Sequence, residues 1–158
     1  MWAHYGNSGL GVCLGYSLKK KKNGCFLPLK IEGFPDYHGQ YIQKIKYTTG
    51  KKTIRLYEYD NPLEIMTWID GAFYKTEKWK YENEYRCVLS ESFLQRGDSY
   101  RKICYPKEIL TEVIFGYKVD QNDINEIREL VRNVYRSRVL FYQINLDIEN
   151  GKLNKILL

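Results

Sequence analysis

Two carboxylates and a guanidinium alternate with other side chains in the segment Trp79–Leu89, which is the part of the chain richest in chemically useful groups. Because side chains alternate faces along a β-strand, Glu82, Glu84 and Arg86 would share one face of a central strand. Like charges on one face repel, so such a face persists when a cation or a ligand offsets the repulsion. The segment is therefore a candidate site, and the alternative is a solvated outer face of an antiparallel sheet.

Positive charge is concentrated in the first third of the chain. Residues 1–56 carry ten Lys and Arg against two Asp and Glu, a net charge of +8, whereas residues 57–158 carry a net charge of −2. The run Lys19–Lys22, followed by Asn23-Gly24, predicts a solvated hairpin or loop tip, and the alternative is a patch that attracts nucleic acid or nucleotide phosphates. The lysines of that patch would be Lys19, Lys20, Lys21, Lys22, Lys44, Lys46, Lys51 and Lys52.

The length of 158 residues predicts a single globular domain that covers residues 1–158. No apolar run approaches the roughly 20 residues of a membrane-spanning helix, and Met1–Tyr5 lacks the pattern of a signal peptide, so we expect a cytoplasmic protein without membrane association. The four cysteines lack the spacing of a zinc site, and no metal site is predicted. Cys13 and Cys87 fall in predicted strands, where we expect reduced, buried thiols.

The elements that must position these residues are mostly strands. Residues 11–17, 41–47, 53–59, 79–89, 110–117 and 139–148 are predicted strands, with short extended pieces at 29–31 and 100–105 inside loops. A capping-box pattern at Asn61–Glu64 predicts a helix to about Tyr74 or Lys75, and Asp123–Glu126 predicts a second helix to about Tyr135. Its apolar stripe would be Ile127, Leu130, Val131 and Val134.

A type I′ turn at Asn150-Gly151 would lead into the last strand, residues 153–158. Strands therefore outnumber helices in this prediction. The predicted class is α+β, with a largely antiparallel sheet and two main helices.

Four segments carry a family resemblance, namely Met1–Gly6, Gly11–Tyr16, Lys75 with Trp79–Arg86, and Leu110–Gly116. In this order and spacing they resemble the bacterial domain of unknown function 2971 family, which has no settled activity. The resemblance spans nearly the whole chain but only the later part of the family's usual domain, because an earlier segment with an Asn-Asp-Pro motif is missing. It therefore implies a fragment or a shortened member.

The layout of that family is in turn similar to ADP-ribosyltransferase-like folds. In arginine-directed members of that fold, a Glu-x-Glu pair on a strand positions the acceptor and stabilises the oxocarbenium-like charge that forms as nicotinamide leaves. The resemblance implies NAD as a substrate. It implies that Glu84 and Glu82 would be catalytic and that His4, Tyr5, Trp79 and Arg86 would contact the substrate or nucleotide.

Three functions stay open at this point. The chain could be an ADP-ribosyltransferase-like or NAD-cleaving enzyme, or an inactive piece of one; a module that binds nucleic acid or another polyanion; or a non-enzymatic interaction domain whose charged face is surface or an internal salt-bridge network. The enzyme hypothesis predicts one cleft that holds His4, Glu82 and Glu84, with a ligand near the backbone of Gly9 and Gly11. It also predicts that Glu84 is the more buried carboxylate and that Arg86 or His4 keeps it ionised.

Overall fold

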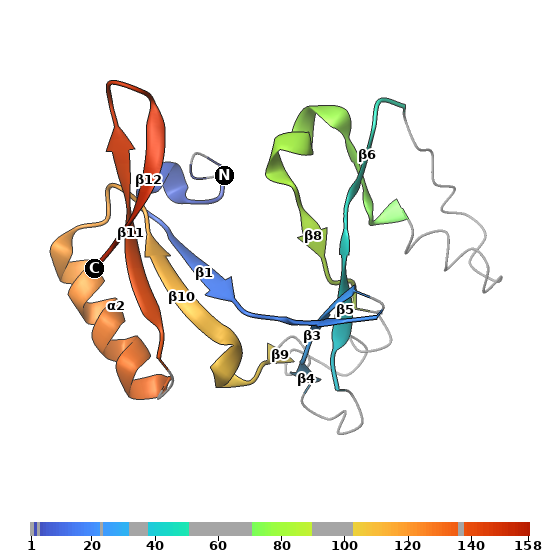
Figure 1. The fold of residues 1–158 in the computed structure, drawn as a ribbon, viewed down its shortest axis with the longest axis horizontal. Coiled ribbons are helices and arrows are strands. Elements are labelled where there is room, and N and C mark those ends of the chain that lie inside the picture. The colour runs from blue at the N-terminus through green and yellow to red at the C-terminus, as the bar shows by residue number, and fades with distance from the viewer. Residues whose placement is uncertain are drawn as a thin grey trace. The chain divides into compact units, whose positions relative to one another are not determined.

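The structure is a computed structural model (Figure 1). It describes residues 2, 4–22, 24–31, 38–50, 71–89, 103–135 and 138–158. Across these residues most elements are strands in antiparallel pairs, with one main helix and several short 3-10 turns. The predicted α+β class is therefore confirmed. Contacts group the chain into two compact units, unit 1 (residues 1–18 and 105–158) and unit 2 (residues 19–104), and each is described by itself. The number of domains stays a prediction.

Unit 1 is built on a four-stranded sheet. Its strand order is β1 (Val12–Tyr16), β10 (Leu110–Phe115), β11 (Leu140–Asp147) and β12 (Lys152–Leu157). The β1–β10 and β11–β12 pairs are antiparallel and the β10–β11 pair is parallel. A parallel pair needs a crossover connection, which the helix α2 (Gln121–Val134) supplies. The strands predicted in these four regions are confirmed.

The core of unit 1 lies where α2 packs on the sheet. Val113 and Phe115 are fully excluded from solvent, and the ring of Phe115 stacks against that of Phe141 with centroids 6.5 Å apart. The prediction that Leu130 and Val134 belong to the buried apolar stripe of the helix is wrong. Leu130 is 58% exposed and Val134 is 42% exposed. The buried face is instead set by Ile124, Ile127, Val131 and Tyr135, which recur at helical spacing.

Asp120 is the N-cap of α2, three residues before Asp123, which was expected to cap it. The Asp120 side chain accepts hydrogen bonds from the backbone N–H groups of Asn122, at 2.8 Å, and Asp123, at 3.0 Å. An Asp at the N-cap satisfies N–H groups that the first helical turn leaves without partners. The predicted start at Asp123 is therefore wrong, because an earlier carboxylate already caps the helix.

The β11–β12 hairpin closes through a longer turn than predicted. Asp147 pairs with Lys152, so four residues connect the strands. The Asp147 carboxylate accepts from the backbone N–H groups of Glu149 and Asn150, each at 3.1 Å, and Gly151 has φ +62°. Asn150 does not have the positive φ that a type I′ turn needs at both central residues, so that prediction is wrong.

Short 3-10 turns frame the strands of unit 1. They are η1 (Asn7–Gly9), near the start of the chain, and η5 (Lys107–Ile109), before β10. Among the helices of the described residues, none is both long and apolar enough to cross a lipid bilayer.

Among the described residues of unit 2, the largest sheet also has four strands. Its order is β2 (Lys19–Lys21), β3 (Gly24–Leu27), β5 (Gln40–Lys44) and β8 (Tyr85–Arg86), and all pairs are antiparallel. The hairpin prediction for the lysine run is confirmed. Strand β3 has β2 on one side and β5 on the other.

Two small sheets complete the described part of unit 2. One pairs β4 (Lys30–Ile31) with β9 (Ile103–Cys104), which confirms both short extended pieces. The other pairs β6 (Lys46–Thr48) with β7 (Tyr74–Thr76) in parallel. Most of the helix predicted from Asn61 lies outside the described residues, as does the strand predicted at 53–59. The predicted end of that helix at Tyr74 or Lys75 is wrong, because both residues belong to β7.

The central strand predicted over residues 79–89 is wrong. Residues Glu77–Glu82 form the 3-10 helix η2, and only Tyr85–Arg86 form a strand. Asn83 takes the left-handed conformation, with φ 46° and ψ 46°, and its N–H donates to the Lys80 carbonyl at 3.2 Å. Asn adopts this conformation more readily than most residues, so it ends the helix and redirects the chain.

Candidate functional site

Four charged side chains of unit 2, Lys75, Glu82, Glu84 and Arg86, meet in what we call the charged cluster. The Lys75 ammonium donates to Glu82 Oε2 and, at 3.1 Å, to Glu84 Oε2. Arg86 Nε donates to Glu84 Oε1, and its Nη2 donates to Oε2 at 3.1 Å. The two carboxylates are thus held by two cations of the same unit.

Backbone contacts fix the charged cluster to the neighbouring strands. The Glu84 N–H donates to the Tyr47 hydroxyl at 2.9 Å, and the Glu84 carbonyl accepts from the Ile45 N–H at 2.9 Å. Arg86 Nη1 donates to the Ala72 carbonyl at 2.6 Å. Ile45 is only 3% exposed, so the backbone of Glu84 is bonded to a buried residue.

Each charge in the cluster is stabilised by its partners. The hydrogen bond from Arg86, aided by Lys75, lowers the pKa of Glu84 below its usual range. Glu84 in turn raises the pKa of Arg86, and Glu82 is the main cause of the raised pKa of Lys75. The expected pairing of Glu84 with Arg86 is present. Both carboxylates face cations, which is the arrangement of an internal salt-bridge network.

The burial of the two carboxylates is the reverse of the prediction. The Glu82 side chain is 7% exposed and that of Glu84 is 26% exposed. The prediction assumed a strand, in which both side chains point the same way. Since Glu82 ends η2, its carboxylate lies against Lys75, whose ammonium is also 5.0 Å from the centroid of the Trp79 ring.

Sequence analysis assigned no role to two of these partners. Lys75 and Tyr47 both contact Glu84, yet they lie 9 and 37 residues before it. Lys75 precedes Glu82 by seven residues across a 3-10 turn, a separation at which no periodic pattern predicts contact. The one signal in the sequence that pointed to Lys75 was its position in the segments that carry the family resemblance.

His4 and Tyr5 lie in unit 1 and are both exposed, Tyr5 to 68%. The carboxylates lie in unit 2, so the cleft expected to join them with His4 stays a prediction. The glycines after Tyr5 do not hold space for a ligand. A Cβ atom on Gly116 would lie 2.1 Å from the Gly9 carbonyl oxygen, and the Gly116 N–H donates to the Gly11 carbonyl at 2.9 Å. The close approach at Gly9 and Gly11 is therefore made by the protein's own backbone.

The net positive charge of the protein resides in unit 2. By sequence, this unit has 17 Lys and Arg against 11 Asp and Glu, whereas unit 1 has eight of each. Within its described residues the acidic side chains are Glu77, Glu82 and Glu84, and all three form ion pairs inside the unit. The Glu77 pair, with Lys80, measures 2.7 Å. The lysines of the hairpin have no carboxylate of the described residues within ion-pair distance.

One side of the β2–β3–β5–β8 sheet combines lysines with aromatic rings. Lys19 pairs with Phe26 and Phe26 with Tyr41 in register, and residues directly opposite each other share a face. The Lys21 ammonium lies 4.0 Å from the Phe26 ring centroid, and the rings of Phe26 and Tyr41 meet edge to face at 5.2 Å. We call this side of the sheet the aromatic face; it consists of Lys19, Lys21, Phe26 and Tyr41.

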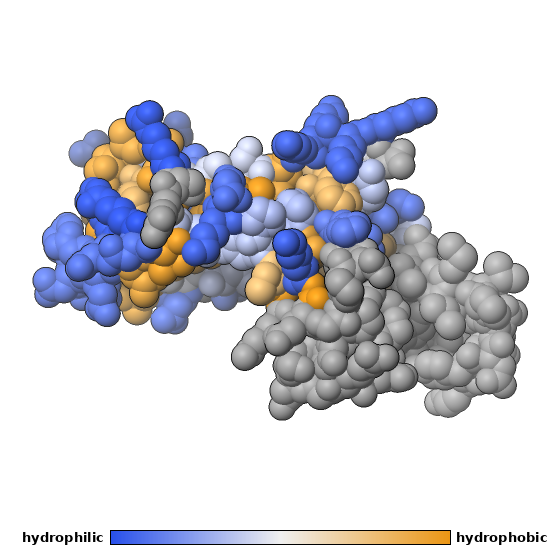
Figure 2. All heavy atoms as spheres, turned by 90° about the horizontal axis from the view of Figure 1, so that it is seen from below, coloured by the Kyte–Doolittle hydropathy of each residue, from blue (hydrophilic) through white to orange (hydrophobic). Residues whose placement is uncertain are grey.

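Other lysines of the predicted patch lie elsewhere on the same unit. Lys20 and Lys44 are on the opposite side of the sheet, where Lys44 lies 5.9 Å from the Tyr85 ring centroid. Lys46 lies 5.4 Å from the Tyr74 ring centroid. Lys51 and Lys52 fall outside the described residues. In the space-filling view, hydrophilic residues project from the described surface with hydrophobic residues between them (Figure 2).

The cysteines and acidic residues form no metal site in the part of the chain that the structure describes, where no three His, Cys, Asp or Glu side chains come together. All four cysteines are free. Cys13 and Cys87 are half-buried rather than buried, so that prediction is wrong, because β1 is a sheet edge and Cys87 follows the short β8. Burial raises the pKa of the Cys87 thiol.

A family model described as "Protein of unknown function (DUF2971)" matches residues 1–87. No curated protein and no solved structure matches the chain. The matched residues are more than half of the chain and include His4, Tyr5 and the charged cluster. The chain therefore belongs to the DUF2971 family of proteins of unknown function.

Proposed function

We propose that this chain is a nucleic-acid-binding module and that the aromatic face of unit 2 is its binding surface. One observation carries the proposal. The described carboxylates of unit 2 are paired with its own cations, whereas no carboxylate of the described residues pairs with Lys19 or Lys21, which lie on the same side of the sheet as Phe26 and Tyr41.

Phosphate groups and bases would use different parts of this surface. Lys19 and Lys21 would contact phosphates and release counterions, which is the main sequence-independent contribution to nucleic-acid affinity. Phe26 and Tyr41 are half-buried rings at the sheet surface, where unpaired bases can stack for about 1–3 kcal/mol each. Stacking needs a base with an open face, so single strands should bind more tightly than duplexes.

The charged cluster has a supporting role in this proposal. Pairing Glu82 and Glu84 with Lys75 and Arg86 removes two negative charges that would otherwise repel phosphates from the unit. It also ties β7 and η2 to β8, the edge strand of the binding sheet. This is the internal salt-bridge network of the interaction-domain hypothesis.

Fluorescence anisotropy with a labelled single strand of about 20 nucleotides tests the proposal, a length that exceeds the span of one small binding domain. The full chain should bind at low salt, and K19Q/K21Q should weaken binding at least tenfold. The matched control K118Q/K152Q removes two exposed lysines from unit 1 and should change affinity less than twofold. No binding at low salt, or equal losses in both variants, would overturn the proposal.

ADP-ribosyl transfer is the second candidate, and one observation favours it. Lys75 brings the carboxylates of Glu82 and Glu84 to a single point, where a ribose hydroxyl could take the place of the ammonium. A carboxylate there would offset the positive charge that develops as nicotinamide leaves. Nicotinamide release from NAD, abolished in E84Q but retained in E149Q, would support it. An unchanged nicotinamide background in wild type and E84Q would exclude it and leave nucleic-acid binding untouched.

A further inference from the structure

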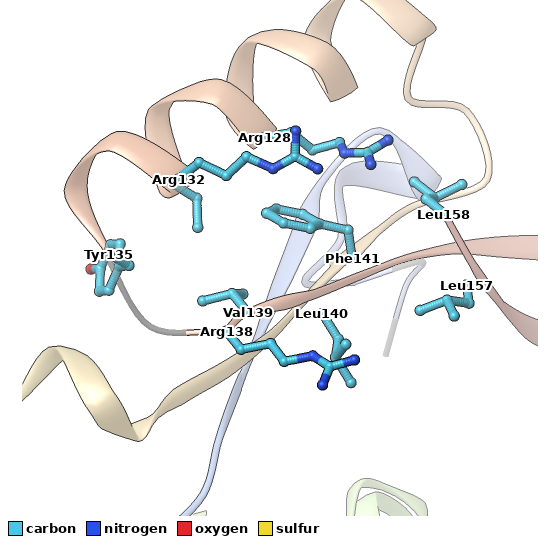
Figure 3. A pocket seen from close by; sticks show the side chains of 10 residues that line it. Arg128, Arg132, Tyr135, Arg138, Val139, Leu140, Phe141, Leu157 and Leu158 are labelled. Carbon is cyan, nitrogen blue, oxygen red and sulfur yellow. The ribbon is translucent and has the colours of Figure 1, made fainter.

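A separate cavity of about 320 Å³ opens in unit 1, between the last turns of α2 and strand β11 (Figure 3). Arginines line it from two elements. Arg128 and Arg132 extend from α2, and Arg138 comes from the segment before β11. Figure 3 shows the first two guanidinium groups on the helix side of the Phe141 ring. Nothing in the proposed function uses these residues.

Phe141 is the surface on which two of these cations rest. The guanidinium carbon of Arg128 lies 5.4 Å from the ring centroid, and that of Arg132 lies 5.8 Å away. The two arginines are four residues apart on one face of α2, where like charges destabilise a helix. Cation–π contact offsets part of this repulsion. It supplies no hydrogen-bond acceptor in the plane of the guanidinium N–H groups.

One buried donor among these arginines lacks an acceptor. Arg128 Nε is buried and has no hydrogen-bond partner among the described residues. No carboxylate in the described ranges forms an ion pair with Arg128, Arg132 or Arg138, although unit 1 as a whole has as many acidic as basic side chains. Three cations are therefore gathered at a cavity where no carboxylate of the described residues pairs with them. A bound oxyanion would supply both the charge and the acceptors.

The rest of the cavity lining is apolar. Val131 and Phe141 are each only 6% exposed and form its base, while Leu157 and Leu158 are 62% and 40% exposed and lie on its wall. The volume is at the lower end of the roughly 300–1,000 Å³ typical of small-molecule sites. A ligand that matches this lining has an apolar or planar body and one anionic group.

We propose that this cavity binds a small organic oxyanion, a carboxylate or phosphate carried by an apolar body. A planar guanidinium donates two parallel hydrogen bonds to either group, which explains why the cations are arginines. The body of the ligand would cover Phe141 and the two leucines. This binding is independent of the nucleic-acid surface of unit 2.

Isothermal titration calorimetry on the full chain tests this with four probes. Phenyl phosphate and benzoate carry both the body and the anion, inorganic phosphate has no body, and benzyl alcohol has no charge. At least one of the first two should bind at least tenfold more tightly than both inorganic phosphate and benzyl alcohol. Which of the two binds better identifies the head group. If neither binds, or if inorganic phosphate binds equally well, the proposal is wrong.

Variants locate the binding. R128Q and R132Q should each weaken binding of the better probe at least fivefold, and R128K should restore only part of it because an ammonium lacks the bidentate fork. The control K118Q removes an exposed charge of the same unit and should bind as wild type does. Urea unfolding of each variant confirms that it folds. A folded R128Q/R132Q double variant that binds the probe normally would overturn the assignment.

Discussion

Arg86 donates to both carboxylate oxygens of Glu84, two residues before it in the chain. Such two-point contacts restrict the rotation of both side chains and are stronger than single hydrogen bonds between neutral groups. The same carboxylate also accepts from Lys75, so it is held from two strands at once. This carboxylate is therefore a fixed part of the fold, which is why we assign the binding function to other side chains.

Stability should fall on acidification in a way that depends on Glu84. Its pKa is lowered in the folded state, so its stabilisation is present above the pKa of an unfolded glutamate, about 4.3, and is lost as pH falls through the folded value. E84Q should therefore be less stable than wild type at neutral pH, and the difference should shrink below about pH 4. Urea unfolding at a series of pH values measures this. The exposed control E149Q should keep a wild-type profile, and an E84Q profile parallel to wild type would refute the prediction.

Removing Lys75 should destabilise the protein more than removing Lys78. Lys75 contacts two carboxylates, one of them 7% exposed, whereas Lys78 is exposed and lies 5.8 Å from the Trp79 ring centroid. K75M leaves the Glu82 carboxylate without this cation. Removing one partner of a buried ion pair lowers stability more than replacing both partners by apolar residues. K75M/E82L should therefore recover part of the stability lost in K75M. Equal thermal midpoints for K75M and K78M would show that the cluster does not support the fold.

The N-cap of α2 gives a prediction of known size. D120A should lower the free energy of unfolding by about 1 kcal/mol, because two backbone N–H groups lose their acceptor. D120N should retain most of the stability, since its side-chain oxygen can accept the same bonds. D123A should cost less than D120A in urea unfolding. The reverse order would mean that the helix starts at Asp123, as the sequence pattern suggested.

The stacked pair of rings beneath α2 should dominate the stability of unit 1. Phe115 is fully buried against Phe141, so F115A should cost about 3–5 kcal/mol through lost burial and a residual cavity. L130A, on the exposed side of the same helix, should cost less than about 1 kcal/mol. Urea unfolding at constant pH compares them. Similar values for the two variants would contradict the assigned core.

The sheet of unit 1 could be predicted from the sequence because its signals are local. Apolar residues at β-spacing mark β10 and β11, and helical spacing marks α2. Its helix start was misplaced because two acidic residues, Asp120 and Asp123, stand three positions apart and both fit the capping pattern. The hairpin turn was misjudged because the Asp147 side chain, rather than Asn150, organises it.

The charged cluster could be predicted only in part. The alternation of side chains along a strand correctly predicted the contact between Glu84 and Arg86. These residues are two positions apart, and the short strand β8 is enough to place them together. The burial of Glu82 depends on a 3-10 helix and a left-handed Asn83, and no local rule distinguishes that helix from a strand in a tyrosine-rich segment. The contact with Lys75 depends on the β6–β7 pair, which the sequence could not reveal because β7 was expected to be helix.

The salt dependence of single-strand binding, compared among charge-matched variants, tests the central proposal most directly. Each lysine that contacts a phosphate adds roughly 0.7 to the slope of log affinity against log salt, so K19Q/K21Q should reduce that slope by about 1.4. K20Q/K44Q removes the same charge from the opposite side of the same sheet and should reduce the slope by less than half as much. Equal slopes for the two variants, or a slope for K19Q/K21Q equal to that of wild type, would contradict the assignment of nucleic-acid binding to the aromatic face.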